Sequence, residues 1–114
     1  MTLEIFLNKL KTTPKDIDFT DTISVIESNY SFTPTAFKNG ELRNNAGENS
    51  GSCKLLAFAK LQSLTKEETL ACFGKYYFEE VSNDPNGNGH QNIRNFMKTG
   101  FEGLVFDNMP LKEK

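Results

Sequence analysis

The chain has 114 residues, of which 37% are hydrophobic and 11% aromatic, and its formal net charge is −2. This length fits one domain around one core, and the apolar content excludes an intrinsically disordered chain. Because no Lys/Arg cluster is present and no apolar run reaches the length of a membrane span, we expect neither nucleic acid nor membrane as a partner. The first residues lack the basic head and apolar stretch of a secretory signal, and two cysteines are too few for a disulfide scaffold. We therefore expect a protein of the producing cell's cytoplasm without disulfides.

Two amphipathic helices are predicted in the first 30 residues. Apolar side chains recur at the helical spacing over residues 3–10 and again over residues 19–30. The second helix is expected to run from about Thr20 to Ser28 or beyond.

A small hairpin or an irregular arm is predicted next. Pro34 disfavours helix at the preceding residue. Asn39 and Gly40 stand between "TAFK" and "ELRN", which is the two-residue signature of a type I′ hairpin turn.

A buried helix is predicted over the stretch "CKLLAFAKLQ", which begins at Cys53. Its side chains are apolar in nearly every direction, and a helix of this kind belongs in the middle of a core. The loop "NNAGENSGS" precedes it, and Ser50 or Ser52 can cap the helix by accepting a bond from a free backbone N–H.

The remaining third of the chain predicts two more helices and a short extended piece. One helix covers "SLTKEETLACFGKYYFEEV", where Thr65 and Glu68 form a capping box. After the loop "SNDPNGNGHQ", a last helix ends at Gly100, with its apolar side chains Ile93, Phe96 and Met97 directed inward. "GLVF" is strand-like, and residues 107–114 form a polar tail that frays. The predicted fold is mainly α, a single compact domain over residues 1–114 with about five helices and a small β-hairpin or minor β element.

Several stretches together resemble one protein family. "FTPTAFKNG", "NSGSCKLLAFAKL", "TLACFGKYY" and "HQNIRNFMKTG" followed by "GLVF" are similar, in this order, to the HopJ type III effector family over about residues 18–106. One departure is Phe101, which stands where the family usually has Trp. The resemblance implies a bacterial protein related to effectors that a plant pathogen injects into host cells, and it implies no established reaction.

Cys53 and His90, with a third residue to orient the histidine, are candidates for nucleophilic catalysis. Cys53 stands at a predicted helix start, where the helix dipole and free N–H groups lower the pKa of a thiol. His90 is the single histidine and is a candidate base, and Asn92 or Asp84 is a candidate to orient it. The alternative, which we favour, is that Cys53 packs as a small apolar residue and His90 caps its helix or binds a surface carboxylate.

A polar pocket is a second candidate site. The two loops "NNAGENSGS" and "SNDPNGNGHQ" are expected to lie together at one end of the bundle and to form the pocket between them. Backbone N–H groups of the first loop are candidates to hold an anion. Candidate ligand-binding residues are Asn49, Ser50, Ser52, Lys54 and Arg94. The aromatic residues 73–78 are interpreted as core rather than as a stacking platform.

The third candidate is a calcium loop. Asp84, Asn86 and Asn88 match the first half of a calcium-binding loop, but the closing position holds Asn95 in place of a glutamate. An Asn/Gly turn explains the stretch better, so we expect no metal and no cofactor.

The leading functional interpretation is a small binding or interaction module for an unknown protein or small molecule. One alternative is a hydrolase or transferase that uses Cys53 and His90. The other is a sensor of a small ligand. We favour a protein that is not an enzyme.

Overall fold

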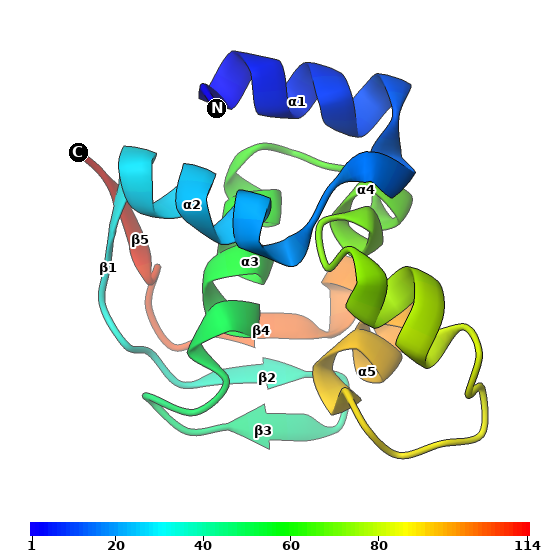
Figure 1. Ribbon diagram of the computed structural model, residues 1–114. Helices are drawn as coiled ribbons and strands as arrows, with labels where there is room; N and C mark the ends of the chain where they lie inside the picture. Colours follow the sequence, from blue (N-terminus) through cyan, green and yellow to red (C-terminus); the bar gives the residue numbers. More distant parts are fainter.

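Helix α3, Ser50–Leu61, runs through the centre of the fold and carries its most buried side chains (Figure 1). The computed structural model describes residues 1–114. The five consecutive residues 55–59 have no exposed surface, and Phe58 packs edge-on against Phe6 and Tyr30 with ring centroids 6.0 and 6.1 Å apart. The prediction of a central, buried helix is therefore confirmed.

The first helices cover one side of α3. Helix α1, Leu3–Thr12, begins at Thr2, whose side chain accepts a bond from the N–H of Ile5. A short 3-10 helix, Pro14–Asp16, leads to α2, Phe19–Asn29, which packs on α3 (Figure 1). Both predicted amphipathic helices are confirmed.

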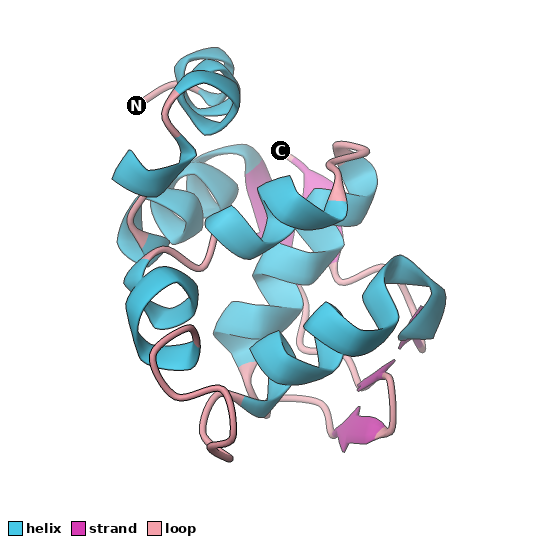
Figure 2. Cartoon of the chain, turned by 90° about the vertical axis from the view of Figure 1, so that its right-hand side faces the viewer, coloured by secondary structure: helices cyan, strands magenta, loops and turns pink.

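The strands form two separate antiparallel sheets (Figure 2). Strand β2, Phe37–Asn39, lies between β3, Leu42–Asn44, and β4, Leu104–Phe106, so the strand predicted at "GLVF" is confirmed. In the other sheet β1, Tyr30–Phe32, pairs with β5, Leu111–Glu113.

The prediction of a fraying polar tail at residues 107–114 is wrong for its last part. Leu111 is only 4% exposed and lies opposite Phe32 in the sheet of β1 and β5. One buried leucine and a partner strand distant in sequence are enough to order this otherwise polar segment.

The hairpin is confirmed, but its turn lies one residue further on than predicted. Asn39 pairs with Leu42, so the turn residues are Gly40 and Glu41. Gly40 has φ +63°, whereas Glu41 has no positive φ, and a glycine with positive φ in the first central position is typical of a type II′ turn rather than type I′. The shift places Asn39 inside the strand, where it is fully buried.

The long helix predicted over "SLTKEETLACFGKYYFEEV" is wrong, because the chain breaks in the middle of it. The capping box of Thr65 and Glu68 is confirmed and starts α4, Lys66–Ala71. A π-helix, Tyr76–Val81, follows after a turn. Gly74 lies in that turn with φ +61°, and a Cβ there would meet the backbone oxygen of Ile17 at 2.8 Å. The glycine therefore allows both the turn and the close approach of another backbone segment.

Helix α5, Gln91–Thr99, ends at Gly100 as predicted, and a 3-10 helix, Gly100–Gly103, leads into β4. Ile93 and Phe96 are buried as predicted, but Met97 is 37% exposed, so its inward placement is wrong. In total 54% of the residues are helical, and two small sheets complete a single compact domain. The fold is thus mixed, with more strand than the predicted minor element. None of its helices has the length and apolar character that a bilayer crossing requires.

Candidate functional site

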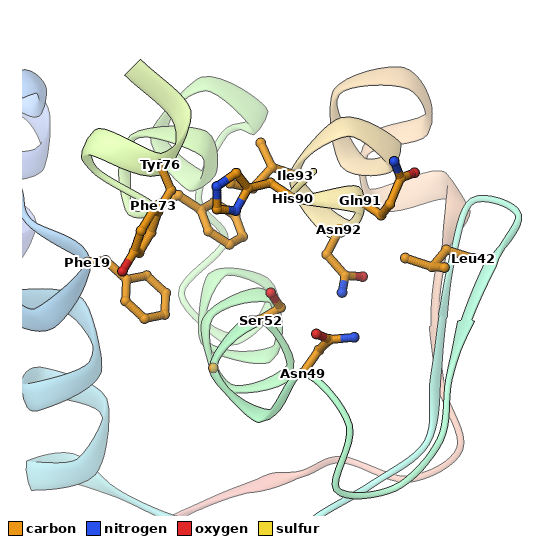
Figure 3. A pocket seen from close by; sticks show the side chains of 11 residues that line it. Phe19, Leu42, Asn49, Ser52, Phe73, Tyr76, His90, Gln91, Asn92 and Ile93 are labelled. Atoms are coloured by element: carbon orange, nitrogen blue, oxygen red, sulfur yellow. The ribbon is translucent and has the colours of Figure 1, made fainter. Parts of the chain in front are cut away.

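A pocket of about 690 Å³ opens where the N-termini of α3 and α5 approach each other (Figure 3). This volume is within the range of small-molecule sites in proteins. The prediction that the two polar loops lie together is confirmed, because residues from the start of both helices line the same pocket. The lining residues are Phe19, Leu42, Asn49, Gly51, Ser52, Phe73, Tyr76, His90, Gln91, Asn92 and Ile93.

One side of the pocket is an aromatic wall, made of Phe19, Phe73, Tyr76 and His90. Phe19 stacks on Phe73 at 6.2 Å between centroids and meets Tyr76 edge-on at 5.4 Å. The ring of Tyr76 lies 5.2 Å from that of His90. Phe73 is buried, as expected for a core residue, whereas Tyr76 is 41% exposed. The interpretation of residues 73–78 as core is therefore wrong for Tyr76, which presents its ring at the pocket.

The opposite side of the pocket rests on an asparagine cluster, made of Asn39, Asn44, Asn49 and Asn92. Asn44 and Asn92 exchange two amide hydrogen bonds of 3.0 and 3.1 Å. Asn39 donates to the backbone oxygen and to the side-chain oxygen of Asn92, at 2.8 and 3.1 Å. Asn49 donates to the side-chain oxygen of Asn44 at 2.6 Å. These bonds tie β2, β3 and the start of α3 to α5, and they fix the position of the Asn92 amide in the pocket.

Three of the four members of the asparagine cluster are buried, whereas Asn49 is exposed. Asn39, Asn44 and Asn92 are 0%, 1% and 6% exposed, and the side-chain oxygen of Asn39 is buried without a hydrogen-bond partner. Buried amides are expensive unless they are bonded, so a connected cluster of this kind fixes one arrangement of the elements that carry it.

Both helices that meet at the pocket begin with a residue in the left-handed conformation. Asn49 caps α3 with φ +50° and His90 caps α5 with φ +54°. Neither side chain accepts a bond from its own helix, so the capping role predicted for Ser50 or Ser52 is wrong and no side chain takes it. First-turn N–H groups of both helices, such as those of Ser52 and Asn92, find no acceptor within the protein. The left-handed backbone conformations of Asn49 and His90 are strained, and strain of this type is often found at ligand sites.

Cys53 faces the core and does not line the pocket. It is 1% exposed, and its sulfur contacts the backbone oxygen of Thr35 at 3.7 Å. Burial raises the pKa of the Cys53 thiol to about 11, so almost no thiolate is present at neutral pH. The predicted role of Cys53 as a nucleophile therefore has no support in the structure.

His90 and Asn92, the other two residues predicted for catalysis, both line the pocket, and each contacts a group other than Cys53. The Nε2 atom of His90 lies 3.0 Å from a carboxylate oxygen of Glu80, on the π-helix. This is the surface-carboxylate contact that we favoured from the sequence. Asn92 belongs to the asparagine cluster and does not orient the imidazole.

The two cations predicted to bind a ligand are engaged elsewhere. The ammonium group of Lys54 pairs with Glu27 at 3.0 Å and lies 4.9 Å from the centre of the Phe32 ring. Arg94 donates hydrogen bonds to the backbone oxygens of Gly89 and Pro85. Of the predicted ligand-binding residues, Asn49 and Ser52 line the pocket, whereas Ser50, Lys54 and Arg94 do not.

The candidate calcium loop has a different organisation. The carboxylate of Asp84 lies 3.9 Å from the guanidinium of Arg94 and is close to Gly87, while Asn86 and Asn88 are exposed. The chain brings together no group of three or more His, Cys, Asp or Glu side chains that would hold a metal ion.

Sequence reasoning named Asn49 and Asn92 but missed Phe19 and the two buried asparagines Asn39 and Asn44. Phe19 contributes to a helical pattern, which gives no sign that its outer edge reaches a pocket. Asn39 and Asn44 lie in β2 and β3, and the local sequence gives no sign that they face Asn92 of α5.

Comparison with known proteins adds a family and a fold. The profile of the HopJ type III effector protein family matches residues 3–111, which extends the resemblance beyond residues 18–106 at both ends. The crystal structure of a protein of unknown function, VPA0580, is similar with a TM-score of 0.98 and 54% sequence identity, over 100% of this chain and 95% of that chain. No curated protein matches the chain.

Proposed function

Because the chain belongs to the HopJ type III effector family, for which neither comparison names a reaction, we propose its function from the pocket: it is a binding module for a small, flat ligand. The observation that carries the proposal is the pairing of an aromatic wall with a polar edge across one pocket. Figure 3 shows the Phe19, Phe73, Tyr76 and His90 rings on one side and the Ser52, Asn49 and Asn92 side chains on the other.

The aromatic wall selects for a flat, partly apolar group. Rings of Tyr76 and His90 lie next to each other at the pocket, and Tyr76 retains enough exposed surface to contact a ligand. An offset-stacked or edge-on contact with an aromatic side chain stabilises a bound ring by about 0.5–1.5 kcal/mol beyond the effect of buried area.

The polar edge selects for hydrogen-bond acceptors. Ser52 and Asn92 line this part of the pocket and their backbone N–H groups have no acceptor within the protein, and the Asn92 amide has a second N–H beyond the one it donates to Asn44. No Asp or Glu lines the pocket, although the whole chain carries a net charge of −2. The ligand class is therefore a planar ring that bears carbonyl or carboxylate oxygens.

The polar edge of the pocket is preorganised, which favours binding. The asparagine cluster holds the polar edge in place before a ligand arrives, which lowers the entropy cost of binding. The buried thiol of Cys53 removes the nucleophile on which the hydrolase or transferase alternative depends. We place the protein in the cytoplasm of the producing cell, and its family relates it to secreted effectors.

Benzamide is a suitable first probe, because it combines a flat ring with an amide edge. In titrations followed by amide signals in nuclear magnetic resonance, we expect shifts concentrated at residues 51–52, 76 and 90–93. Cyclohexanecarboxamide has the same amide group but lacks the flat aromatic ring, so it is expected to bind more weakly than benzamide.

Replacing Tyr76 by Ala is expected to weaken benzamide binding by about two- to tenfold, which is the loss of one aromatic contact. Val105→Ala is the matched control, because Val105 is also an exposed apolar residue but lies outside the pocket. Shifts spread over the whole surface, or equal affinities of the Tyr76→Ala and Val105→Ala variants, would overturn the proposal.

A further inference from the structure

The chain contains three Asn-Gly pairs in three different environments, at residues 39–40, 86–87 and 88–89. Asn followed by Gly is the dipeptide most open to spontaneous deamidation, because glycine has no Cβ to hinder attack by its backbone nitrogen. We propose that Asn88 is a site of spontaneous modification in the folded protein, whereas Asn39 and Asn86 are protected by the fold.

The reaction needs only water and the chain itself. The backbone nitrogen of Gly89 loses its proton and attacks the side-chain carbonyl carbon of Asn88, so that a nitrogen–carbon bond forms and a five-membered succinimide closes. The side-chain amide nitrogen then leaves as ammonia. Water adds to either carbonyl of the ring, and one carbon–nitrogen bond breaks to give Asp or isoAsp. No atom changes its oxidation state.

The Asn88–Gly89 pair meets the requirements for this reaction. Both residues are exposed. The N–H of Gly89 donates to no acceptor in the structure, so no hydrogen bond must break before it reacts. A Cβ built on Gly89 would meet nothing within 4 Å, which shows open space around the attacking nitrogen.

In the neighbouring Asn86–Gly87 pair, Asn86 is exposed, but Gly87 is half-buried and its backbone N–H is hydrogen-bonded. The N–H of Gly87 donates to the backbone oxygen of Asp84 at 3.1 Å. The Asp84 carboxylate lies against Gly87, where an added Cβ would come within 2.0 Å of its oxygen. A carboxylate in this position opposes the negative charge that the nitrogen acquires when it loses its proton.

The Asn39–Gly40 pair is locked in the three-stranded sheet. Asn39 has no exposed surface, and its amide nitrogen is bonded twice to Asn92. The N–H of Gly40 donates to the backbone oxygen of Gly103 at 2.9 Å. This pair reacts only in molecules that have opened the sheet, and such molecules are rare.

Modification at Asn88 has consequences at the edge of the pocket. Formation of isoAsp adds one carbon to the main chain, two residues before His90. The side chain of Arg94 donates a hydrogen bond to the backbone oxygen of Gly89, and the side chain of Gln91 donates one to the backbone oxygen of Asn88. The longer main chain displaces one or both of these carbonyls, and the new carboxylate adds a negative charge near the start of α5.

The test is peptide mapping by mass spectrometry after incubation of the folded protein at mildly alkaline pH and at weakly acidic pH. We expect amide-to-acid conversion at Asn88 that is faster at the higher pH, and conversion at Asn39 that is more than about tenfold slower. Asn86 is expected to fall between them. Incubation in urea is expected to bring the three rates together, because the protection comes from the fold.

Gly89→Ala is the decisive variant. It adds a side chain beside the attacking nitrogen in a position with open space and without positive φ, so the fold is expected to tolerate it. Conversion at Asn88 should fall severalfold in this variant while thermal unfolding stays unchanged. Conversion of Asn39 or Asn86 in the folded protein as fast as Asn88, or an unchanged rate in Gly89→Ala, would overturn the proposal.

Discussion

Two adjacent residues at the start of α3 show how one step along a helix decides chemistry. Ser52 lines the pocket, whereas Cys53 points into the core with 1% exposure. Successive residues of a helix are about 100° apart around its axis, so neighbours can face solvent and core. The position near a helix start, which suggested a reactive thiol from the sequence, has less effect than the loss of water around the sulfur.

Cys53 should therefore behave as a core thiol when it is treated with iodoacetamide. Folding raises its pKa from 9.0 to about 11, so the folded state keeps the proton between these two values while the unfolded chain loses it. We expect slow alkylation of native protein near neutral pH, measured by mass spectrometry that separates Cys53 from Cys72. The contribution of the Cys53 proton to the free energy of unfolding is complete below pH 9 and declines as the pH rises toward 11.

The variant His90→Ala provides the control for this prediction. His90 contacts Glu80 and not Cys53, so its removal should leave the alkylation rate of Cys53 unchanged. Rapid labelling that slows in this variant would restore the pair as a catalytic unit.

Asn92→Ala should be more harmful than an ordinary surface substitution. It removes the partner of the Asn44 amide and one acceptor of Asn39, both of which stay buried. The expected loss in the free energy of unfolding is about 1–3 kcal/mol, measured by urea denaturation. Lys98→Ala, on the exposed side of the same helix, is the control and should cost less than about 0.5 kcal/mol. Equal losses in the two variants would argue against the asparagine cluster as a stabilising unit.

At the scale of single elements, hydrophobic spacing predicted a helix correctly where no turn interrupts the helical backbone. The amphipathic α1 and the all-round apolar α3 are such cases. The break at Gly74 was missed because apolar residues continue on both sides of it. The close approach of the Ile17 and Phe19 backbone, which leaves no room for a Cβ at Gly74, is visible only in the fold. The hairpin turn was displaced by one residue because the strand length depends on the burial of Asn39 against α5, which the local sequence does not reveal.

Gly74→Ala tests the reason for the break. The added Cβ would meet two backbone atoms, the oxygen of Ile17 at 2.8 Å and the nitrogen of Phe19 at 2.9 Å, in addition to the strain of a positive φ. We expect a loss of about 1–3 kcal/mol in the free energy of unfolding. A stability equal to that of the wild type would mean that α4 and the π-helix can join into one helix.

At the scale of the whole molecule, the sheets depend on contacts that no local pattern contains. Strand β4 pairs with β2, and β5 pairs with β1, across most of the chain. This explains why the sequence predicted a mainly α fold and a loose tail. The pocket could be anticipated because a polar loop precedes each of two helices, whereas the hydrogen bonds of its asparagine cluster depend on three-dimensional packing.

Leu111→Ala measures how much the last strand contributes. Leu111 is 4% exposed, so its truncation should lower the free energy of unfolding by about 2–5 kcal/mol in thermal or urea melts. Lys112→Ala, on the exposed face of the same strand, should change it by less than about 0.5 kcal/mol. If neither variant changes the free energy of unfolding, β5 does not contribute to the stability of the core.

The asparagine cluster has a consequence for the conditions under which the pocket keeps its shape. Amide groups neither gain nor lose protons in the physiological range and carry no net charge. A junction of carboxylates and ammonium groups would weaken in acid or in concentrated salt, since protons neutralise it and mobile ions screen it. The hydrogen bonds of the asparagine cluster, which connect β2 and β3 to α5, are all made between neutral groups. The cluster should therefore keep the same geometry when the protein passes between media of different acidity and ionic strength.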